Sequence, residues 1–301
     1  MPANMLKSLL GASKGRPAFS VLQMAAIAAQ DVAPLDEETL HFMRLQVESE
    51  VFSAVRPPDM WAELAKGLMG HKPSRMVQSL HDCGALALVL PEVAALFGVP
   101  QSADDPPQVD IGLHTLRVLD EAAQRGAPLA VRFAALVMNV GKSDSPPEHL
   151  PAHYRHMDRA RPRIERICKR FRVADACRDL ALLALAECER VHRAARMRAG
   201  SMAAMLERVD ALRNPDRFEL LLLVCSCDFN AYPRRQWRRY TKADMLRAAL
   251  DACRRVDPCN LPPPDATEDD GMSPLLQARA LAVATALRSA RWADPTDDTV
   301  D

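Results

Sequence analysis

The segment from Tyr232 to Lys242 carries the residue types that bind nucleic acid. It interleaves four arginines with aromatic rings. Cationic side chains neutralise phosphates and release counterions, while aromatic and guanidinium planes stack on unpaired bases. A solvated, salt-bridged surface is the alternative interpretation. The candidate RNA-binding side chains here are Arg234, Arg235, Trp237, Arg238, Arg239, Tyr240 and Lys242.

A second basic region spans residues 151–200, with 13 Lys and Arg against 6 Asp and Glu. Its candidate RNA contacts are Arg155 and Arg159, and a solvated helix face is again the alternative. A basic helix face offers mainly charge, so we expect the 232–242 segment to matter more for RNA binding. Over the whole chain 39 basic residues balance 39 acidic ones, so net charge itself indicates no partner.

The run VRFAALVMNVGKSD (131–144) is typical of an apolar helix that delivers Met138 and Asn139 and then ends at Gly141 and Lys142. A thioether and a neutral amide are poor ligands for the cations that activate water. We therefore do not expect a catalytic metal at this helix end.

Eight cysteines are spread along the chain without a close C-x-x-C pair. Reduced thiols packed as small hydrophobic groups are the simplest interpretation. The alternative is a zinc site formed by Cys188, Cys225 or Cys227 with a histidine. No apolar run is long enough to span a bilayer, and the N-terminus does not resemble a signal peptide, so we expect a soluble, cytoplasmic protein.

The elements that position these residues are predicted to be helices. Ala, Leu, Arg, Glu and Met are prominent, Gly is scarce, and no alternating strand pattern is visible, which favours an all-α, elongated multi-helix array. The predicted helices cover residues 110–125, 128–140, 155–171, 174–191, 202–212, 215–229 and 273–290. The expected divisions are a flexible tail (1–17), a first helical region (18–105), a second helical domain (106–256) and a C-terminal part (257–301) with a Pro-rich and acidic linker, one amphipathic helix and an acidic tail. The first division falls in a Pro-rich loop at 98–109.

Several segments resemble the C-terminal half of the bacterial CCA-adding enzyme, the tRNA nucleotidyltransferase that carries a fused HD domain. They are LHDCGALALVLPEVAALFGVPQ (80–101), VDIGLHTLRVLDEAA (109–123), VRFAALVMNVGK (131–142), RVADACRDLALLALAE (172–187) and DALRNPDRFELLLLVCSCD (210–228). The resemblance implies that the first helical region corresponds to the neck and body helices and the second to a degenerate HD-type domain.

The resemblance also implies a loss of nucleotidyl transfer. Residues 1–17 are too few for the family's catalytic palm. The family's neck motif, whose acidic and Arg side chains read the incoming nucleotide, corresponds to residues 16–23. Those residues lack the acidic groups and both arginines of the motif. We therefore expect no CCA addition, and any residual activity would be that of a phosphohydrolase.

In HD-type phosphohydrolases, the two residues at the end of the apolar helix are His and Asp, where this chain has Met138 and Asn139. His114 and Asp228 match the first and last HD ligands, His153 and His156 match two positions of the family's His-rich loop, and Glu189 replaces another usual His. His114, His153, His156 and Asp228 are thus weak metal candidates. His114 as a hydrogen-bonded core histidine and Asp228 as a local cap are the alternatives. We expect no cofactor, and at most a weakly held divalent metal.

The leading hypothesis is a non-catalytic relative of this helical half that binds tRNA or another structured RNA. One alternative is a regulatory module that docks a protein partner, for example a nucleotidyltransferase head on a separate chain. The other is a residual metal-dependent phosphohydrolase. RNA binding is expected to depend on salt, whereas protein docking would leave tRNA unbound.

Overall fold

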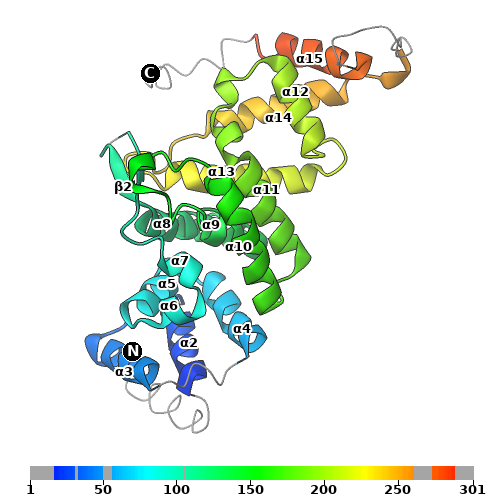
Figure 1. Ribbon diagram of the computed structural model, residues 1–301. Coiled ribbons are helices and arrows are strands. Elements are labelled where there is room, and N and C mark those ends of the chain that lie inside the picture. The colour runs from blue at the N-terminus through cyan, green and yellow to red at the C-terminus, as the bar shows by residue number, and fades with distance from the viewer. Residues whose placement is uncertain (1–16, 31–32, 50–55, 105, 261–272, 289–301) are drawn as a thin grey trace. The chain divides into compact units, whose positions relative to one another are not determined.

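The structure is a computed structural model of all 301 residues. It describes the chain except for residues 1–16, 31–32, 50–55, 105, 261–272 and 289–301 (Figure 1). The described residues form helices and one very small sheet, so the predicted all-α class is confirmed. The tail predicted at 1–17 lies almost wholly outside the described residues, as do most of the predicted linker and the acidic C-terminal tail.

The chain divides into two compact units. The first comprises residues 1–186 and 227–236, and the second comprises residues 187–226 and 237–301. Helix α11 (Asp175–His192) begins in the first unit and ends in the second, whereas α13 (Pro215–Asn230) does the reverse. These units do not follow the predicted ranges 18–105, 106–256 and 257–301, which remain predictions.

The first unit is built mainly from helices that begin with a proline or an aspartate cap. Proline already has the helical φ and lacks only an N–H that would be unpaired there, and it opens α2, α4, α5 and α7. Asp36 and Asp110 accept backbone hydrogen bonds that start α3 and α8. The helix bounds are Pro17–Ala28 (α2), Glu37–Glu48 (α3), Pro57–Leu68 (α4), Pro73–Asp82 (α5), Ala85–Val89 (α6), Pro91–Ala94 (α7), Ile111–Gln124 (α8), Leu129–Val137 (α9) and His156–Phe171 (α10).

Two short strands correct the prediction that residues 98–109 form a plain loop. Strands β1 (Pro100–Ser102) and β2 (Gln108–Asp110) pair antiparallel, with Gln101 opposite Val109. Each strand has three residues, which is too short for an alternating pattern to be recognised in the sequence. The hairpin places the buried Gln101 next to the end of α9, where its side chain takes part in the candidate site.

In the second unit, α12 (Ala199–Arg208), α14 (Thr241–Arg254) and α15 (Pro274–Ala286) pack against one another (Figure 1). Ser273 caps α15 by accepting a hydrogen bond from the backbone N–H of Leu276. Val283 on α15 is fully buried, and Arg279 forms a 2.5 Å ion pair with Glu207 of α12. The last helix is therefore an integral part of this unit.

The other predicted helices agree with the structure to within a few residues. The largest differences are that α9 ends at Val137, that α12 begins at Ala199 and ends at Arg208, and that α15 ends at Ala286. In the first unit, Trp61 of α4 packs edge-on against Phe133 of α9, with ring centroids 5.5 Å apart. Among the described residues, no helix combines the length and the apolar character needed to cross a membrane.

Candidate functional site

His114 and Asp228, which are 114 residues apart in the chain, lie together in the first unit. His114 projects from α8 and is fully buried, and its Nε2 is 2.9 Å from Oδ1 of Asp228 on α13. The Tyr232 ring packs on the imidazole, with centroids 4.3 Å apart. The other ring nitrogen, Nδ1, is buried without a hydrogen-bond partner. The two candidate ligands thus lie next to each other, and in the structure they are joined by a hydrogen bond.

Met138 and Asn139 follow directly after the last residue of α9, and both are buried. The backbone turns there, with the N–H of Lys142 donating to the carbonyl of Asn139 at 2.9 Å. The Lys142 ammonium then donates to Oε1 of Gln101 at 3.0 Å. Lys142 therefore ties the end of the apolar helix to the β1–β2 hairpin.

His153 is held by hydrogen bonds at both ring nitrogens. Its Nε2 donates to the carbonyl of Pro100 at 2.8 Å, and its Nδ1 lies 2.9 Å from Oγ of Ser145. Burial lowers the pKa of His153, which favours the neutral ring with Nδ1 as acceptor. His156 donates from Nδ1 to the His153 carbonyl at 3.0 Å. In the part of the chain that the structure describes, the four predicted metal candidates do not supply three ligand atoms close enough to share one ion.

The residues of the 232–242 segment that belong to the first unit have internal contacts. The Arg235 guanidinium pairs with Asp104 and lies over the rings of Phe229 and Tyr232, at 4.7 and 5.2 Å from their centroids. Arg234 is exposed and has a left-handed backbone, with φ of 63°. Arg235 therefore stabilises the local fold, and Arg234 presents its side chain at the surface.

The residues of this segment in the second unit are more open. Trp237 is 80 % exposed and has a left-handed backbone with φ of 65°. Arg238 and Arg239 are exposed as well, although Arg239 also pairs with Asp244 at 2.7 Å. Lys242 is half-buried in the first turn of α14. An exposed indole next to two exposed guanidinium groups is suited to stacking and to phosphate contact.

The basic residues at the start of α10 are engaged locally. Arg155 pairs with Asp158 at 3.0 Å. Arg159 donates to the carbonyl of Gly141 at 3.0 Å and to Oγ of Ser145 at 2.8 Å. Arg159 therefore holds the chain after α9 in place, and less of its charge is available to a partner.

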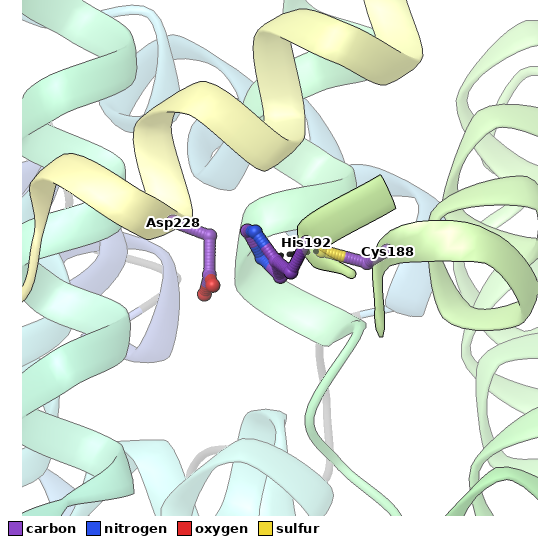
Figure 2. Close-up of side chains that lie close together, drawn as sticks. All are labelled: Cys188, His192 and Asp228. Atoms are coloured by element: carbon purple, nitrogen blue, oxygen red, sulfur yellow. Dashed lines mark hydrogen bonds between the residues drawn. The ribbon is translucent and has the colours of Figure 1, made fainter. Parts of the chain in front are cut away.

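A cluster of soft ligands lies in the second unit. Cys188 and His192 come from successive turns of α11, with Sγ and Nε2 3.3 Å apart, and Figure 2 shows this hydrogen bond as a dashed line. The hydroxyl of Tyr240 is 2.7 Å from Nδ1 of the same histidine, which makes Tyr240 a buried structural residue. The Cys225 thiol, followed by burial, holds the pKa of Cys188 well above its usual range. Asp228, also labelled in Figure 2, belongs to the first unit.

Comparison with known proteins identifies the relatives of this chain. The multifunctional CCA protein of Burkholderia cenocepacia (strain HI2424) is 45 % identical over 239 residues, which cover 79 % of this chain and 58 % of that protein. The chain is homologous to the C-terminal half of the multifunctional CCA proteins. The resemblance to the CCA-adding enzyme is thereby confirmed. No family model matches the chain.

Other multifunctional CCA proteins match to the same extent. The protein from Dechloromonas aromatica (strain RCB) is 44 % identical over 245 residues, covering 78 % of this chain and 59 % of that protein. The protein from Nitrosospira multiformis (strain ATCC 25196 / NCIMB 11849 / C 71) is 43 % identical over 246 residues, covering 80 % of this chain and 60 % of that protein. The chain thus spans somewhat more than half the length of these multifunctional CCA proteins, and the activity of the whole proteins is not established for it.

Replacing Met138 with His and Asn139 with Asp should give the chain a divalent metal that the parent does not hold at this place. The double variant would add an imidazole and a carboxylate at the end of α9, and His114 and Asp228 already lie 2.9 Å apart. We expect elemental analysis of the purified double variant to show about one more metal ion per chain than the parent.

The matched control is Asn139→Asp alone, which adds the carboxylate without the imidazole and should gain little metal. If the double variant gains no more metal than this control, the end of α9 and the His114–Asp228 pair are not placed to share an ion.

Proposed function

We propose that this chain binds tRNA or another structured RNA and does not itself add nucleotides. The support comes from its homology to the multifunctional CCA proteins, whose name refers to the CCA sequence, and from the open Arg and Trp side chains near the start of α14. The observation that carries the proposal is the exposure of Trp237 between arginines.

An exposed indole at this position lowers the stability of the protein unless a ligand covers it. Exposed tryptophan leaves a large apolar area in water, and a left-handed backbone costs roughly 1–2 kcal/mol for a residue with a Cβ. Strained residues often occur where a ligand is bound, and Trp237 combines the strain with 80 % exposure. Stacking on an unpaired base would cover the indole, and Arg238 and Arg239 of the same unit would supply phosphate contacts.

Hydrogen bonds and ion pairs within the fold reduce the number of side chains that we propose to contact RNA. Arg235, Tyr240 and Arg159 are already used within the fold, so we assign them to positioning the segment and its neighbours. Arg155 and Lys242 remain secondary candidates. The proposed contact surface is chosen by exposure and consists of Trp237, Arg238 and Arg239 on the second unit. Arg234, which is exposed on the first unit, is a separate candidate.

The lack of catalysis is proposed from the side chains at two places in the described chain. Ser20 and Gln23 lie in α2 at the positions where the resemblance calls for the two arginines of the neck motif, and Ser20 is buried. Met138 and Asn139 occupy the end of α9 where a metal-binding pair is needed for HD-type hydrolysis. The Ser20 and Gln23 side chains do not supply the guanidinium hydrogen bonds that select a nucleotide.

Two variants test RNA binding separately by charge and by stacking. Arg238→Ala with Arg239→Ala should weaken tRNA binding, and the slope of log K against log salt should fall by nearly one unit for each phosphate that these arginines neutralise. Trp237→Ala should cost about 1–3 kcal/mol of binding free energy with little change in slope. Filter binding or gel shift across a salt series measures both quantities, and circular dichroism confirms the fold.

Arg161→Ala with Arg166→Ala is the matched control, because both arginines are exposed on α10 and their replacement also removes two charges. We expect this control to keep most of the parent affinity. If the parent does not bind tRNA, or if all variants bind like the parent, the segment is structural and the docking of a protein partner becomes the better hypothesis.

A further inference from the structure

A pocket of about 370 Å³ lies along one face of α14 in the second unit. Besides Arg239, which precedes the helix, and Ala286, the last residue of α15, it is lined by Asp244, Arg247, Ala248, Asp251 and Arg255. The three- and four-residue steps between these positions put their side chains on one face of α14. The volume falls within the roughly 300–1,000 Å³ that is typical of small-ligand sites.

Two guanidinium groups of this pocket have nitrogens that the described fold does not use. Arg239 is exposed, and its bond to Asp244, at 2.7 Å, involves Nε and leaves both terminal nitrogens open. Arg255 is exposed and has no ion pair with any described residue. Arg247, in contrast, is bonded to Glu219 at 2.8 Å and serves as a wall. Open guanidinium groups are suited to phosphate oxygens.

Two carboxylates lie between these arginines along α14. Asp244 is shared by Arg239 and Arg247, at 2.7 and 3.3 Å. Asp251 is exposed, and within the described chain it has only a long ion pair of 3.6 Å with Arg254. A carboxylate repels phosphate, so a pocket for phosphate alone has no use for it. It does accept hydrogen bonds from hydroxyl groups.

We propose that this pocket holds one nucleotide of the bound RNA and recognises its ribose. Arg239 and Arg255 come from opposite ends of α14, and the carboxylates lie between them, which matches a ribose with a phosphate on each side. The 2′-hydroxyl donates to Asp251, and the two arginines bind the flanking phosphates. The 2′-hydroxyl is the group by which proteins distinguish RNA from DNA.

This inference rests on the proposed RNA binding and adds to it a selection for ribose. Arg239 belongs both to the pocket and to the proposed contact surface around Trp237, so the same RNA chain would reach both. Deoxyribose would leave the Asp251 carboxylate close to phosphate without a donor. A site built to bind a hydroxyl group rejects an analogue that lacks it.

The test compares two probes on the full chain by fluorescence anisotropy. One is a stem-loop RNA, and the other is the same stem-loop with 2′-deoxyribose at every unpaired position. The parent should bind the all-ribose probe about tenfold more tightly, which corresponds to one hydrogen bond to a charged group. Binding of tRNA is measured alongside, so that RNA binding and ribose selection are scored separately.

Variants locate the selection. Asp251→Ala should bring the ratio of the two affinities to about one, and Ala248→Met should do the same by filling the pocket without changing its charge. Arg255→Ala should weaken both probes by a similar factor and lower the salt slope by nearly one unit. Asp216→Ala is the matched control, because it removes an exposed carboxylate of the same unit outside the pocket and should keep the parent ratio. Circular dichroism confirms that each variant is folded.

Equal affinity of the parent for both probes would overturn the ribose proposal and leave tRNA binding standing. A preference for ribose that persists in Asp251→Ala, or that is lost equally in Asp216→Ala, would also overturn it, because recognition would then lie elsewhere. If the parent binds neither tRNA nor either probe, the proposed RNA binding fails, and the ribose proposal fails with it.

Discussion

Replacing Arg132 with Met should lower the free energy of unfolding by about 3–5 kcal/mol, because three buried backbone carbonyls would be left without their donor. The Arg132 side chain lies in the apolar helix α9 and is 5 % exposed. It donates to the carbonyls of Ala127, Leu68 and Gly70, each at 2.8 Å. Two of these carbonyls come from the end of α4 and the residues after it, so one guanidinium joins that region to α9.

Urea denaturation followed by circular dichroism measures this effect. Arg166→Met is the matched control, since this arginine is exposed on α10 and its replacement should change stability by less than about 0.5 kcal/mol. Arg132→Lys should fall between the two, because one ammonium has a single donor centre for three carbonyls. Equal decreases in stability in the Arg132→Met and Arg166→Met variants would mean that the buried hydrogen bonds contribute nothing.

Gly141→Ala should cost about 3 kcal/mol or more, because a methyl group at this position has no space. A Cβ built on Gly141 would overlap the backbone carbonyl oxygen of His156 and lie 2.6 Å from the backbone nitrogen of Ala160. Both atoms are part of α10, and helix backbone cannot give way as a flexible side chain can. The turn after α9 therefore packs directly on α10, and only glycine permits this approach.

Gly126→Ala distinguishes crowding from backbone strain. Gly126 has φ of 62° and no atom within 4 Å of its added Cβ, so alanine there should cost only roughly 1–2 kcal/mol. Thermal or urea unfolding of both variants compares the two costs. If Gly141→Ala is no more destabilising than Gly126→Ala, then α10 has moved away to accommodate the methyl group.

Helices are largely predictable from the sequence because their signals are local. Aspartate caps, prolines at the first turn and apolar spacing are read within one or two turns, and they locate α8, α10 and α11 closely. The two strands are not predictable from the sequence, because three residues are too few to show the alternation of apolar and polar side chains. Pro91 is recognisable in the sequence as a helix breaker. The sequence does not show that the segment around it forms two short helices, α6 and α7.

The site is less predictable because it depends on contacts between distant residues. The closeness of His114 to Asp228 follows from the family resemblance and not from spacing, since 114 residues separate them. The burial of Tyr240 is not apparent in the sequence because its partner, His192, is 48 residues away. The pairing of Cys188 with His192 does have a local signal, because a four-residue spacing puts both side chains on one face of α11.

The two units are interleaved along the sequence, and this limits how either unit can be transferred by gene fusion and the order in which the units can fold during synthesis. The second unit is assembled from residues 187–226 and 237–301, with ten residues of the first unit between them. Neither unit is therefore one continuous stretch that a single gene fusion or one proteolytic cut could transfer intact. During synthesis α12 and α14 emerge before α15, so the second unit is complete only after α15 has been made and packs on both.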